Sequence, residues 1–528
     1  MLWRTSSLSD RRTATSRIPV AFFASGEYVS GTGSRACAGG WSDMNKCTMD
    51  GVAPGRCWSV CTSRGREMNG KVRHSLRLTA MLYLLDYGAG NIQSLANSLT
   101  KLGYTYEWVR EPSDICKADK LLFPGVGSFA SAMDALHAKG YVEPLRAYIQ
   151  SGKPLMGICV GMQVLFEGSD ESPGVQGLGI VPARVGRFAT QDAFGRKAVP
   201  HMGWSLANVV EWDGCADQRH ELAKSYGMHD SNPSHYYFVH SYRVAWDANV
   251  AEWALTTTQY GNEIFVSSIQ HANVFATQFH PEKSGQAGLD LLAAWLQLEH
   301  VEPTTRVGRP VSSTEHMPTR RIVACLDVRS NDAGDLVVTK GESYDVRERG
   351  EQDAGASHVR NMGKPVELAQ RYYDEGADEI AFLNITSFRN WALNDQPMLS
   401  LLNVAAATIF VPLTVGGGIR DFTDPDGTFH PALKVAHAYF RAGADKVSIG
   451  SEAVYAVEQL LARANEAGDT SGDPVAAPAA ALRGDTGIEQ IAHAYGVQAV
   501  VVSVDPKRVY VESAEAAGVH APSVVSGP

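Results

Sequence analysis

The feature that most constrains the fold is a change in the sequence pattern at Met81. Residues 1–80 show no sustained helical or strand periodicity and are rich in Ser, Thr, Gly and Arg. From Met81 onward, apolar strand patterns alternate with helix patterns, beginning with LYLLDYG and a helix pattern over 91–103. Alternating strands and helices predict parallel sheets covered by helices. We therefore predict an α/β protein that begins near Met81.

The domain organisation follows from the length of 528 residues, which is too long for one hydrophobic core. The strand and helix patterns of the first domain, a central mostly parallel sheet with flanking helices, close with a helix over 285–298. A polar stretch with three prolines follows. We predict a disordered leader at 1–80, a first domain at 81–298, a linker at 299–319, and a second domain at 320–528 with a solvated insertion at 466–487.

The second domain has five strand patterns separated by helix patterns, which is typical of a (β/α) barrel. The uncharged stretch from Pro397 to Ile419 is interpreted as a helix over 398–408 and a buried strand, because it contains Pro412 and three glycines. A complete barrel has eight strands, so we expect this barrel to be C-terminally truncated. The predicted strands are 321–326, 379–385, 409–415, 445–449 and 498–504.

Charge and cysteine usage exclude several classes of function. The net charge is -10, yet residues 1–80 hold 12 Lys and Arg against 5 Asp and Glu. The acidic remainder argues against broad nucleic-acid binding. Four of the eight cysteines lie in 1–80 without the spacing of a zinc site, so we expect no metal and no other cofactor. The sparse cysteines favour a reducing compartment, the cytoplasm, or a plastid if the Arg-rich start is a transit peptide.

Cys159 lies in KPLMGICVGMQ, between an apolar strand pattern and a helix pattern, with glycines on both sides. On a tight strand-to-helix turn the helix N-terminus stabilises a thiolate, and small neighbours let a substrate approach. The pattern favours a nucleophile, with an inert core cysteine as the alternative.

Two further segments support the nucleophile. In TQFHPEKS, extended backbone can place His280 and Glu282 near one site, where the carboxylate orients the imidazole as the base for the thiol. In FPGVGSF, Gly125 and Gly127 give a flexible backbone that can turn an N–H toward a developing oxyanion. The three segments together predict cysteine-based acyl transfer.

In this combination, residues 81–298 resemble the class I glutamine amidotransferases. The resemblance implies that Cys159 attacks the side-chain amide of glutamine, that His280 shuttles the proton and that Glu282 orients His280. It also implies that Gln163 helps to hold the substrate, and that ammonia and glutamate are released.

Three more segments, LLDYGAGN, VPHMGWS and YFVHSY, narrow the resemblance to the glutaminase of imidazole glycerol phosphate synthases. Two of them contain His201 and His240. For these two residues we favour a structural, hydrogen-bonded role over catalysis.

In the second domain, Asp327 and Asp505 lie at the C-terminal ends of the first and fifth predicted strands. Side chains at these ends face the active site of a barrel, so the two are candidates for an acid/base pair, with loop capping as the alternative. The third and fourth strands are followed by Gly416 to Gly418 and by Gly450 with Ser451. Their backbone N–H groups can hold a phosphate.

These features look like the cyclase half of the same family, which is fused to the glutaminase in fungi and plants. The resemblance implies that ammonia converts a phosphoribulosyl formimino carboxamide ribotide to imidazole glycerol phosphate and aminoimidazole carboxamide ribotide. The residues that match the family are Asp327 and Asp505 as acid and base, Lys340 in a mobile loop, Gly418, Gly450 and Ser451 at one phosphate site, and Arg321, Glu379 and Lys446 in a charged ring that gates ammonia entry.

The expected partners are therefore glutamine and a phosphorylated ribotide, with an intramolecular glutaminase–cyclase interface in a monomer, and neither nucleic acid nor a membrane. The missing strands would remove the second phosphate site. The alternative to a complete synthase is therefore a truncated remnant that has a glutaminase-type domain without cyclase activity and acts as an interaction or regulatory protein.

Overall fold

A computed structural model describes residues 21–23, 81–88, 90–212, 223–228, 234–298, 308–311, 317–330, 336–340, 360–385, 393, 397–466 and 484–504. Within these ranges the side chains of residues 21–23, Trp212, Gly308, Lys340 and residues 360–363 are not described. No helix among the described residues is long and apolar enough to cross a membrane.

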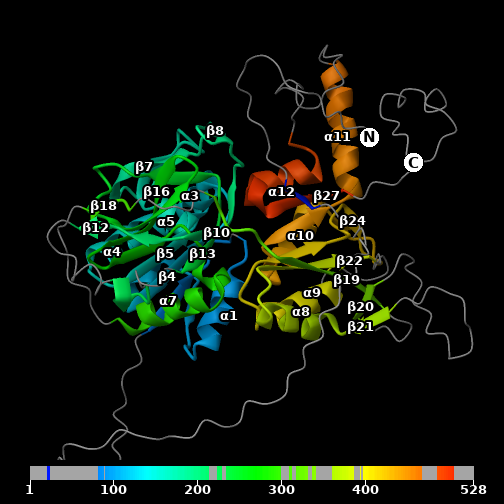
Figure 1. Cartoon of the computed structure of the whole chain (residues 1–528), viewed down its shortest axis with the longest axis horizontal. Helices are drawn as coiled ribbons and strands as arrows, with labels where there is room; N and C mark the ends of the chain where they lie inside the picture. The colour runs from blue at the N-terminus through cyan, green and yellow to red at the C-terminus, as the bar shows by residue number, and fades with distance from the viewer. Residues whose placement is uncertain are drawn as a thin grey trace, which may run out of the picture. The chain divides into compact units, whose positions relative to one another are not determined.

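The first sheet contains a parallel half, as the alternating patterns predict. Five parallel strands lie in the order β3-β2-β4-β5-β17. Figure 1 labels two of them, the neighbours β4 and β5. All residues of β2, β5 and β17 are buried, so these strands read as continuous apolar runs. The elements are β2 (Leu82–Leu85), α1 (Gln93–Lys101), β3 (Glu107–Val109), α2 (Pro112–Lys117), β4 (Lys120–Gly125), α3 (Phe129–Ala138), α4 (Val142–Gln150), β5 (Leu155–Cys159), α5 (Val160–Gln163), β17 (Val274–Thr277), the short 3-10 helix η1 (Pro281–Lys283) and α7 (Gly285–Gln297).

Beyond β17 the same sheet becomes largely antiparallel. The order continues β16-β14-β7-β6, with β15 and β11 branching from β16, and β10 pairs with β13 in a separate ladder. Buried and more exposed side chains alternate along β7 and β10, whereas β15 and β16 are buried along most of their length. Their bounds are β6 (Phe166–Ser169), β7 (Val181–Arg187), β8 (Gln191–Asp192), β9 (Gly195–Arg196), β10 (His201–Leu206), β11 (Asn208–Val209), β12 (Glu211–Trp212), β13 (His235–His240), β14 (Tyr242–Ala245), β15 (Ala254–Tyr260) and β16 (Glu263–His271).

The second sheet contains all five predicted strands, parallel and in chain order: β19, β22, β23, β26 and β27. The uncharged stretch from Pro397 forms a helix and a strand, as predicted. The elements are β19 (Val323–Ser330), α8 (Pro365–Asp374), β22 (Glu379–Asn384), α9 (Pro397–Ala406), β23 (Leu413–Gly416), the hairpin β24 (Phe422–Thr423) and β25 (Phe429–His430), α10 (Ala432–Arg441), β26 (Lys446–Ile449), α11 (Ser451–Glu466), α12 (Gly487–Tyr495), the short η4 (Val497–Ala499) and β27 (Val500–Ser503).

Both edges of this sheet carry strands that the sequence analysis does not predict. At one edge, the antiparallel strands β20 (Leu336–Lys340) and β21 (Arg360–Gly363) extend β19. At the other, β1 (Ala21–Phe23), which falls in the expected leader, pairs in parallel with β27. In the expected linker, β18 (Gly308–Arg309) pairs with β12. Most of the expected insertion, 467–483, lies outside the described residues.

The start of α7 is packed against η1 by a glycine. A Cβ atom at Gly288 would lie 1.8 Å from the carbonyl oxygen of Pro281, closer than any side chain can approach. Pro281 stands between His280 and Glu282 in the chain. Gly288 therefore lets the helix approach the turn that carries both residues.

We predict that Gly288→Ala lowers the free energy of unfolding by about 1–3 kcal/mol, because the backbone clash outweighs the better helix propensity of alanine. Urea unfolding followed by circular dichroism measures the change. Gly174→Ala is the matched control, since a Cβ there meets nothing within 4 Å. Equal stability of the two variants would contradict the packing argument.

Candidate active site

Cys159 lies on a strained turn at the end of β5. Its backbone has φ 54° and ψ -109°, a conformation that residues other than glycine rarely adopt. The helix α5 begins at the next residue. The side chain is buried within the first core. The predicted tight strand-to-helix turn is therefore present, with a positive φ at the cysteine itself.

Two glycines allow this turn to pack against β4. A Cβ on Gly161 would lie 1.9 Å from the carbonyl oxygen of Phe123, and one on Gly125 would lie 2.4 Å from the backbone nitrogen of Gly161. The ends of β4 and β5 are also paired, with Gly125 opposite Cys159. Gly125 thus brings the FPGVGSF backbone beside the sulfur.

His280 and Glu282 form a buried hydrogen-bonded pair. The His280 Nδ1 donates to Glu282 Oε1 at 2.7 Å, so its Nε2 is the nitrogen that remains for proton transfer. Burial opposes protonation of the imidazole, but the charges of Cys159 and Glu282 outweigh it and raise the pKa of His280 well above its ordinary value. These charges therefore favour the protonated imidazole of His280.

Gln163 is buried at the end of α5. Its Nε2 donates to the backbone oxygen of Tyr242 at 3.1 Å and to Oε1 of Gln278 at 3.0 Å. Gln278 in turn contacts Cys159, with Nε2 3.5 Å from Sγ. The structure therefore connects the predicted substrate-holding residue to the sulfur through a residue that the sequence analysis does not single out.

The segment after β4 is held by the residues that follow β2. The Tyr87 hydroxyl donates to the carbonyl oxygen of Val126 at 3.3 Å, and a Cβ on Gly90 would lie 2.0 Å from Val126 Cγ2. Burial and the charge of Cys159 raise the pKa of Tyr87, so its hydroxyl stays a neutral donor. Gly127 has φ +110°, which only glycine adopts readily.

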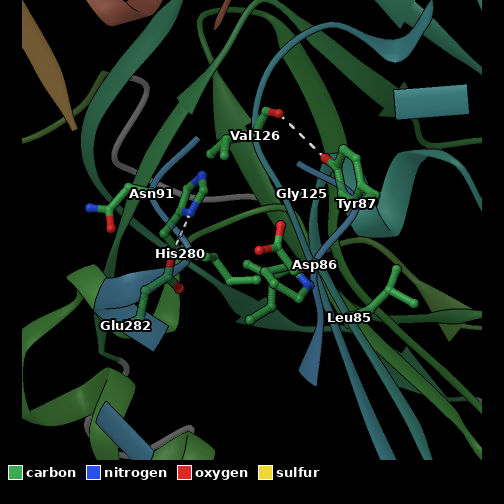
Figure 2. Close-up of a pocket in the computed structure, with 11 residues that line it drawn as sticks. Leu85, Asp86, Tyr87, Asn91, Gly125, Val126, His280 and Glu282 are labelled. Carbon is green, nitrogen blue, oxygen red and sulfur yellow. Dashed lines mark hydrogen bonds and ion pairs between the residues drawn. The ribbon is translucent and has the colours of Figure 1, made fainter. Parts of the chain in front are cut away.

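A pocket opens beside the His280–Glu282 pair (Figure 2). His280 and Glu282 line one part of it, and Asp86 and Tyr87 line another. Figure 2 also shows Asn91 at the wall near His280. The remaining lining residues are Leu85, Ile92, Pro124, Gly125, Val126 and Ile158.

The pocket wall continues into contacts with the second sheet's helices and loops. Asn91 Nδ2 donates to the carbonyl oxygen of Gly443 at 2.9 Å and to Asp445 Oδ1 at 2.8 Å. Lys283, the residue after Glu282, pairs with Asp445 Oδ2 at 2.7 Å, and Arg441 pairs with Asp86 at 3.1 Å. Asp445 thus contacts both the turn that carries His280 and Glu282 and the pocket wall.

His201 and His240 form a buried hydrogen-bonded chain. His240 Nδ1 donates to the Tyr242 carbonyl oxygen at 2.8 Å, so its Nε2 accepts from His201 Nδ1 at 3.2 Å, and His201 Nε2 accepts from Ser205 at 3.0 Å. Burial lowers the pKa of His240 to about 3 and that of His201 as well. Both rings are neutral, which supports the structural role that the sequence analysis favours.

In the second sheet, Asp327 lies on β19 and is half-buried, and this burial raises the pKa of its carboxyl group. Asp505 lies outside the described residues. The backbone of Lys340 ends β20, opposite Arg360, while its side chain is not described. The structure therefore leaves the predicted acid/base pair and loop lysine as predictions.

The glycine loops lie where the sequence analysis expects them, at the ends of β23 and β26. Gly417 and Gly418 have φ values of +89° and +77°, and a Cβ on Gly417 would lie 2.1 Å from the carbonyl oxygen of Asn384. Gly450 and Ser451 follow β26 directly, and Ser451 is the first residue of α11. The start of a helix of this length favours a bound anion.

The structure brings the three predicted gate residues together. Glu379 is fully buried and pairs with Lys446 through Oε1 and with Arg321 through Oε2 at 3.1 Å. Thr414 donates to the same Oε1 at 2.7 Å. Burial of the carboxyl group raises the pKa of Glu379, but Lys446 and Arg321 outweigh this effect and hold it below its ordinary value. Burial lowers the pKa of Lys446.

The first sheet's domain also contributes to this charged cluster. Lys446 Nζ lies 5.9 Å from the ring centre of Tyr237 on β13, in cation–π contact. Burial raises the pKa of Tyr237 well above its ordinary value, so the ring carries no charge.

Among the described residues, no group of three or more His, Cys, Asp or Glu could hold a metal ion.

Two family models match the chain. The model of class-I glutamine amidotransferases matches residues 83–296, and that of histidine biosynthesis proteins matches residues 321–471. The chain is 51% identical to imidazole glycerol phosphate synthase hisHF of Emericella nidulans over 437 residues, which are 82% of this chain and 74% of the relative.

The chain belongs to the imidazole glycerol phosphate synthase hisHF family. It is also 52% identical to the synthase of Schizosaccharomyces pombe, again over 82% of this chain and 74% of the relative. With the synthase of Arabidopsis thaliana, which is named chloroplastic, it shares 47% identity over 83% of this chain and 68% of the relative. The predicted family and fold class are thereby confirmed.

Several residues around the pocket are not predicted from the sequence. Gln278 was detectable, because it lies two positions before His280 in an extended segment, the same spacing that pairs His280 with Glu282. Asn91, Lys283 and Asp445 give no such signal, because what they do depends on a contact between segments far apart in the chain.

We predict that Glu379→Gln lowers the free energy of unfolding by about 3–5 kcal/mol, because it leaves the buried Lys446 without its counter-charge. Chemical denaturation followed by tryptophan fluorescence measures the effect. The double variant with Lys446→Met should recover most of the loss, since a buried pair can be replaced by apolar groups at little cost. A double variant as unstable as the single one would show that the pair is not what matters there.

Proposed function

We propose that Cys159, His280 and Glu282 hydrolyse glutamine in this chain. We also propose that the domain built on the second sheet uses the released ammonia to form imidazole glycerol phosphate. The observation that carries the proposal is the buried His280–Glu282 hydrogen bond beside a cysteine on a strained strand-to-helix turn. The high identity to whole synthases supports this function over that of a remnant without cyclase activity.

In the first half-reaction, the Cys159 thiol gives its proton to His280 Nε2, and the sulfur attacks the carboxamide carbon of glutamine. The negative charge that forms on the carboxamide oxygen is stabilised by backbone N–H groups near Gly125 and Gly127. His280 then donates the proton to the departing nitrogen, which leaves as ammonia. Water, activated by His280, hydrolyses the thioester to glutamate.

We further propose that ammonia leaves through the contact around Asp445. The pocket beside His280 is walled by Asp86 and Asn91, which bind Arg441 and Asp445 across that contact. The cluster of Arg321, Glu379 and Lys446 then forms the gate. Tyr237, which contacts Lys446 from the glutaminase part, supports this assignment.

In the second half-reaction, Asp327 is proposed as a general acid/base together with Asp505. Burial raises the pKa of its carboxyl group, which therefore takes up a proton more readily than an exposed aspartate does. Gly418, Gly450 and Ser451 are proposed to hold one phosphate of the ribotide through backbone and hydroxyl donors, and Lys340 to close over the substrate.

We predict that Cys159→Ala reduces glutamine-dependent synthesis by about a thousandfold or more, because the nucleophile is lost. Synthesis with added ammonium salt should stay near that of the unchanged protein. The exposed Cys116, changed to Ala, is the matched control. If both the glutamine-dependent and the ammonia-dependent reaction disappeared in a folded Cys159→Ala protein, Cys159 would be structural.

We predict that Asp327→Asn reduces ring formation about a hundredfold or more with either nitrogen source, because the amide cannot transfer the proton. Product formation with ammonium salt measures this directly. Asp374→Asn, at the exposed end of α8, serves as the control. Undiminished turnover would mean that Asp327 only caps the following loop.

A further inference from the structure

Gln278 is fully buried between β17 and the catalytic histidine. Its backbone N–H donates to the carbonyl oxygen of Ser267 at 2.9 Å, which fixes the main chain. Its side-chain nitrogen lies 3.5 Å from the sulfur of Cys159. A buried amide beside a reacting sulfur matters chemically, because its N–H stabilises a thiolate whereas its oxygen would repel one.

The orientation of this amide is set by a chain of hydrogen bonds that begins at a backbone carbonyl. The Tyr242 oxygen can only accept, so the group of Gln163 that faces it is the NH₂. The same NH₂ donates to the neighbouring atom of Gln278, which is therefore the oxygen. The remaining end of the Gln278 amide, the one that faces Cys159, is then its NH₂.

His240 strengthens the starting point of this chain. Its Nδ1 donates to the same Tyr242 carbonyl oxygen at 2.8 Å. Both lone pairs of the carbonyl are thus engaged by buried donors. A rotation of the Gln163 amide would place two oxygens together and leave this acceptor partly unpaired, which is costly in a buried site.

We propose that Gln278 is a positioning residue of the glutaminase site, with its N–H held toward the Cys159 sulfur by the chain from Tyr242 through Gln163. The proposal rests on the proposed role of Cys159 as the nucleophile. On one side Glu282 holds the protonated imidazole, and on the other Gln278 holds the negative sulfur. The two amide side chains do no proton transfer themselves.

The test compares two replacements of Gln278 of nearly the same size. Gln278→Met removes the N–H and adds no charge, whereas Gln278→Glu places a carboxylate against the sulfur. The first readout is the rate of Cys159 alkylation by iodoacetamide against pH, followed by mass spectrometry of the peptide that contains Cys159. The second is the kcat and KM of glutamate formation from glutamine.

We expect Gln278→Met to move the alkylation midpoint upward by about one pH unit and to lower kcat about tenfold at neutral pH, with KM nearly unchanged. Gln278→Glu should shift both readouts further in the same directions. Gln163→Met, which keeps Gln278 but frees its amide to rotate, should give a smaller upward shift. These pH profiles would not move if Gln278 only filled space.

Gln270→Glu is the matched control. Gln270 is a second buried glutamine, on β16, and its side chain donates to the backbone oxygen of Ala272 at 3.1 Å. It therefore reports what a new buried carboxylate does to the fold alone. Thermal unfolding of each variant shows whether the protein has folded, and Gln163→Met still tests the chain if both Gln278 variants do not fold.

The proposal would be overturned if folded Gln278→Met had an unshifted alkylation midpoint and a kcat within about twofold of that of the unchanged protein. So would an unshifted midpoint in Gln163→Met, because the orientation would then not depend on the chain from Tyr242. Glutamine hydrolysis that persists in Cys159→Ala would instead reject the proposed function. The two failures are therefore distinguishable.

Discussion

The His280–Glu282 hydrogen bond lies on a turn that the rest of the site depends on. Pro281 begins η1, and Gly288 lets α7 pack against this turn, which supports the backbone that carries both side chains. The next residue, Lys283, pairs with Asp445. Five consecutive residues, His280 to Ser284, thus hold the proposed base, its proposed orienting acid and a contact to the second sheet. The backbone N–H of Lys283 also donates to the carbonyl oxygen of His280 at 3.1 Å, so Lys283 contacts both Asp445 and the proposed base.

The fold was predictable where local pattern and tertiary burial agree. The parallel strands of both sheets are short apolar runs between helices, and the five strands of the second sheet were all predicted. The strands of the antiparallel part of the first sheet were not predicted one by one. Several strands in this stretch of the chain, such as β8, β9 and β11, are only two residues long, too short to show an alternating pattern. The pairing of β1 with β27 has no local signal, since it joins residues that are far apart in the chain.

The candidate site was predictable where chemistry requires a residue type next to a turn. Cys159, His280 and Glu282 were found from glycine spacing and strand alternation, and the structure brings His280 and Glu282 into contact. Arg321, Glu379 and Lys446 were identified only through the family resemblance, yet they form one buried cluster. The direction of the hydrogen bonds from Gln163 to Gln278 could not be predicted. It is fixed by the carbonyl oxygen of Tyr242, whose position depends on the folded sheet.

The charge of the gate cluster bears on what can pass it. Two cations, Lys446 and Arg321, pair with the carboxylate of Glu379, and the charge of Asp445 also acts on Lys446. Ammonium would have to lose its hydration to pass two buried cations, whereas neutral ammonia would exchange only hydrogen bonds. Because burial lowers the pKa of Lys446, this lysine is also the cation of the cluster that most easily gives up its proton. If ammonia takes the route that we propose, the floor of the second sheet therefore selects the uncharged form.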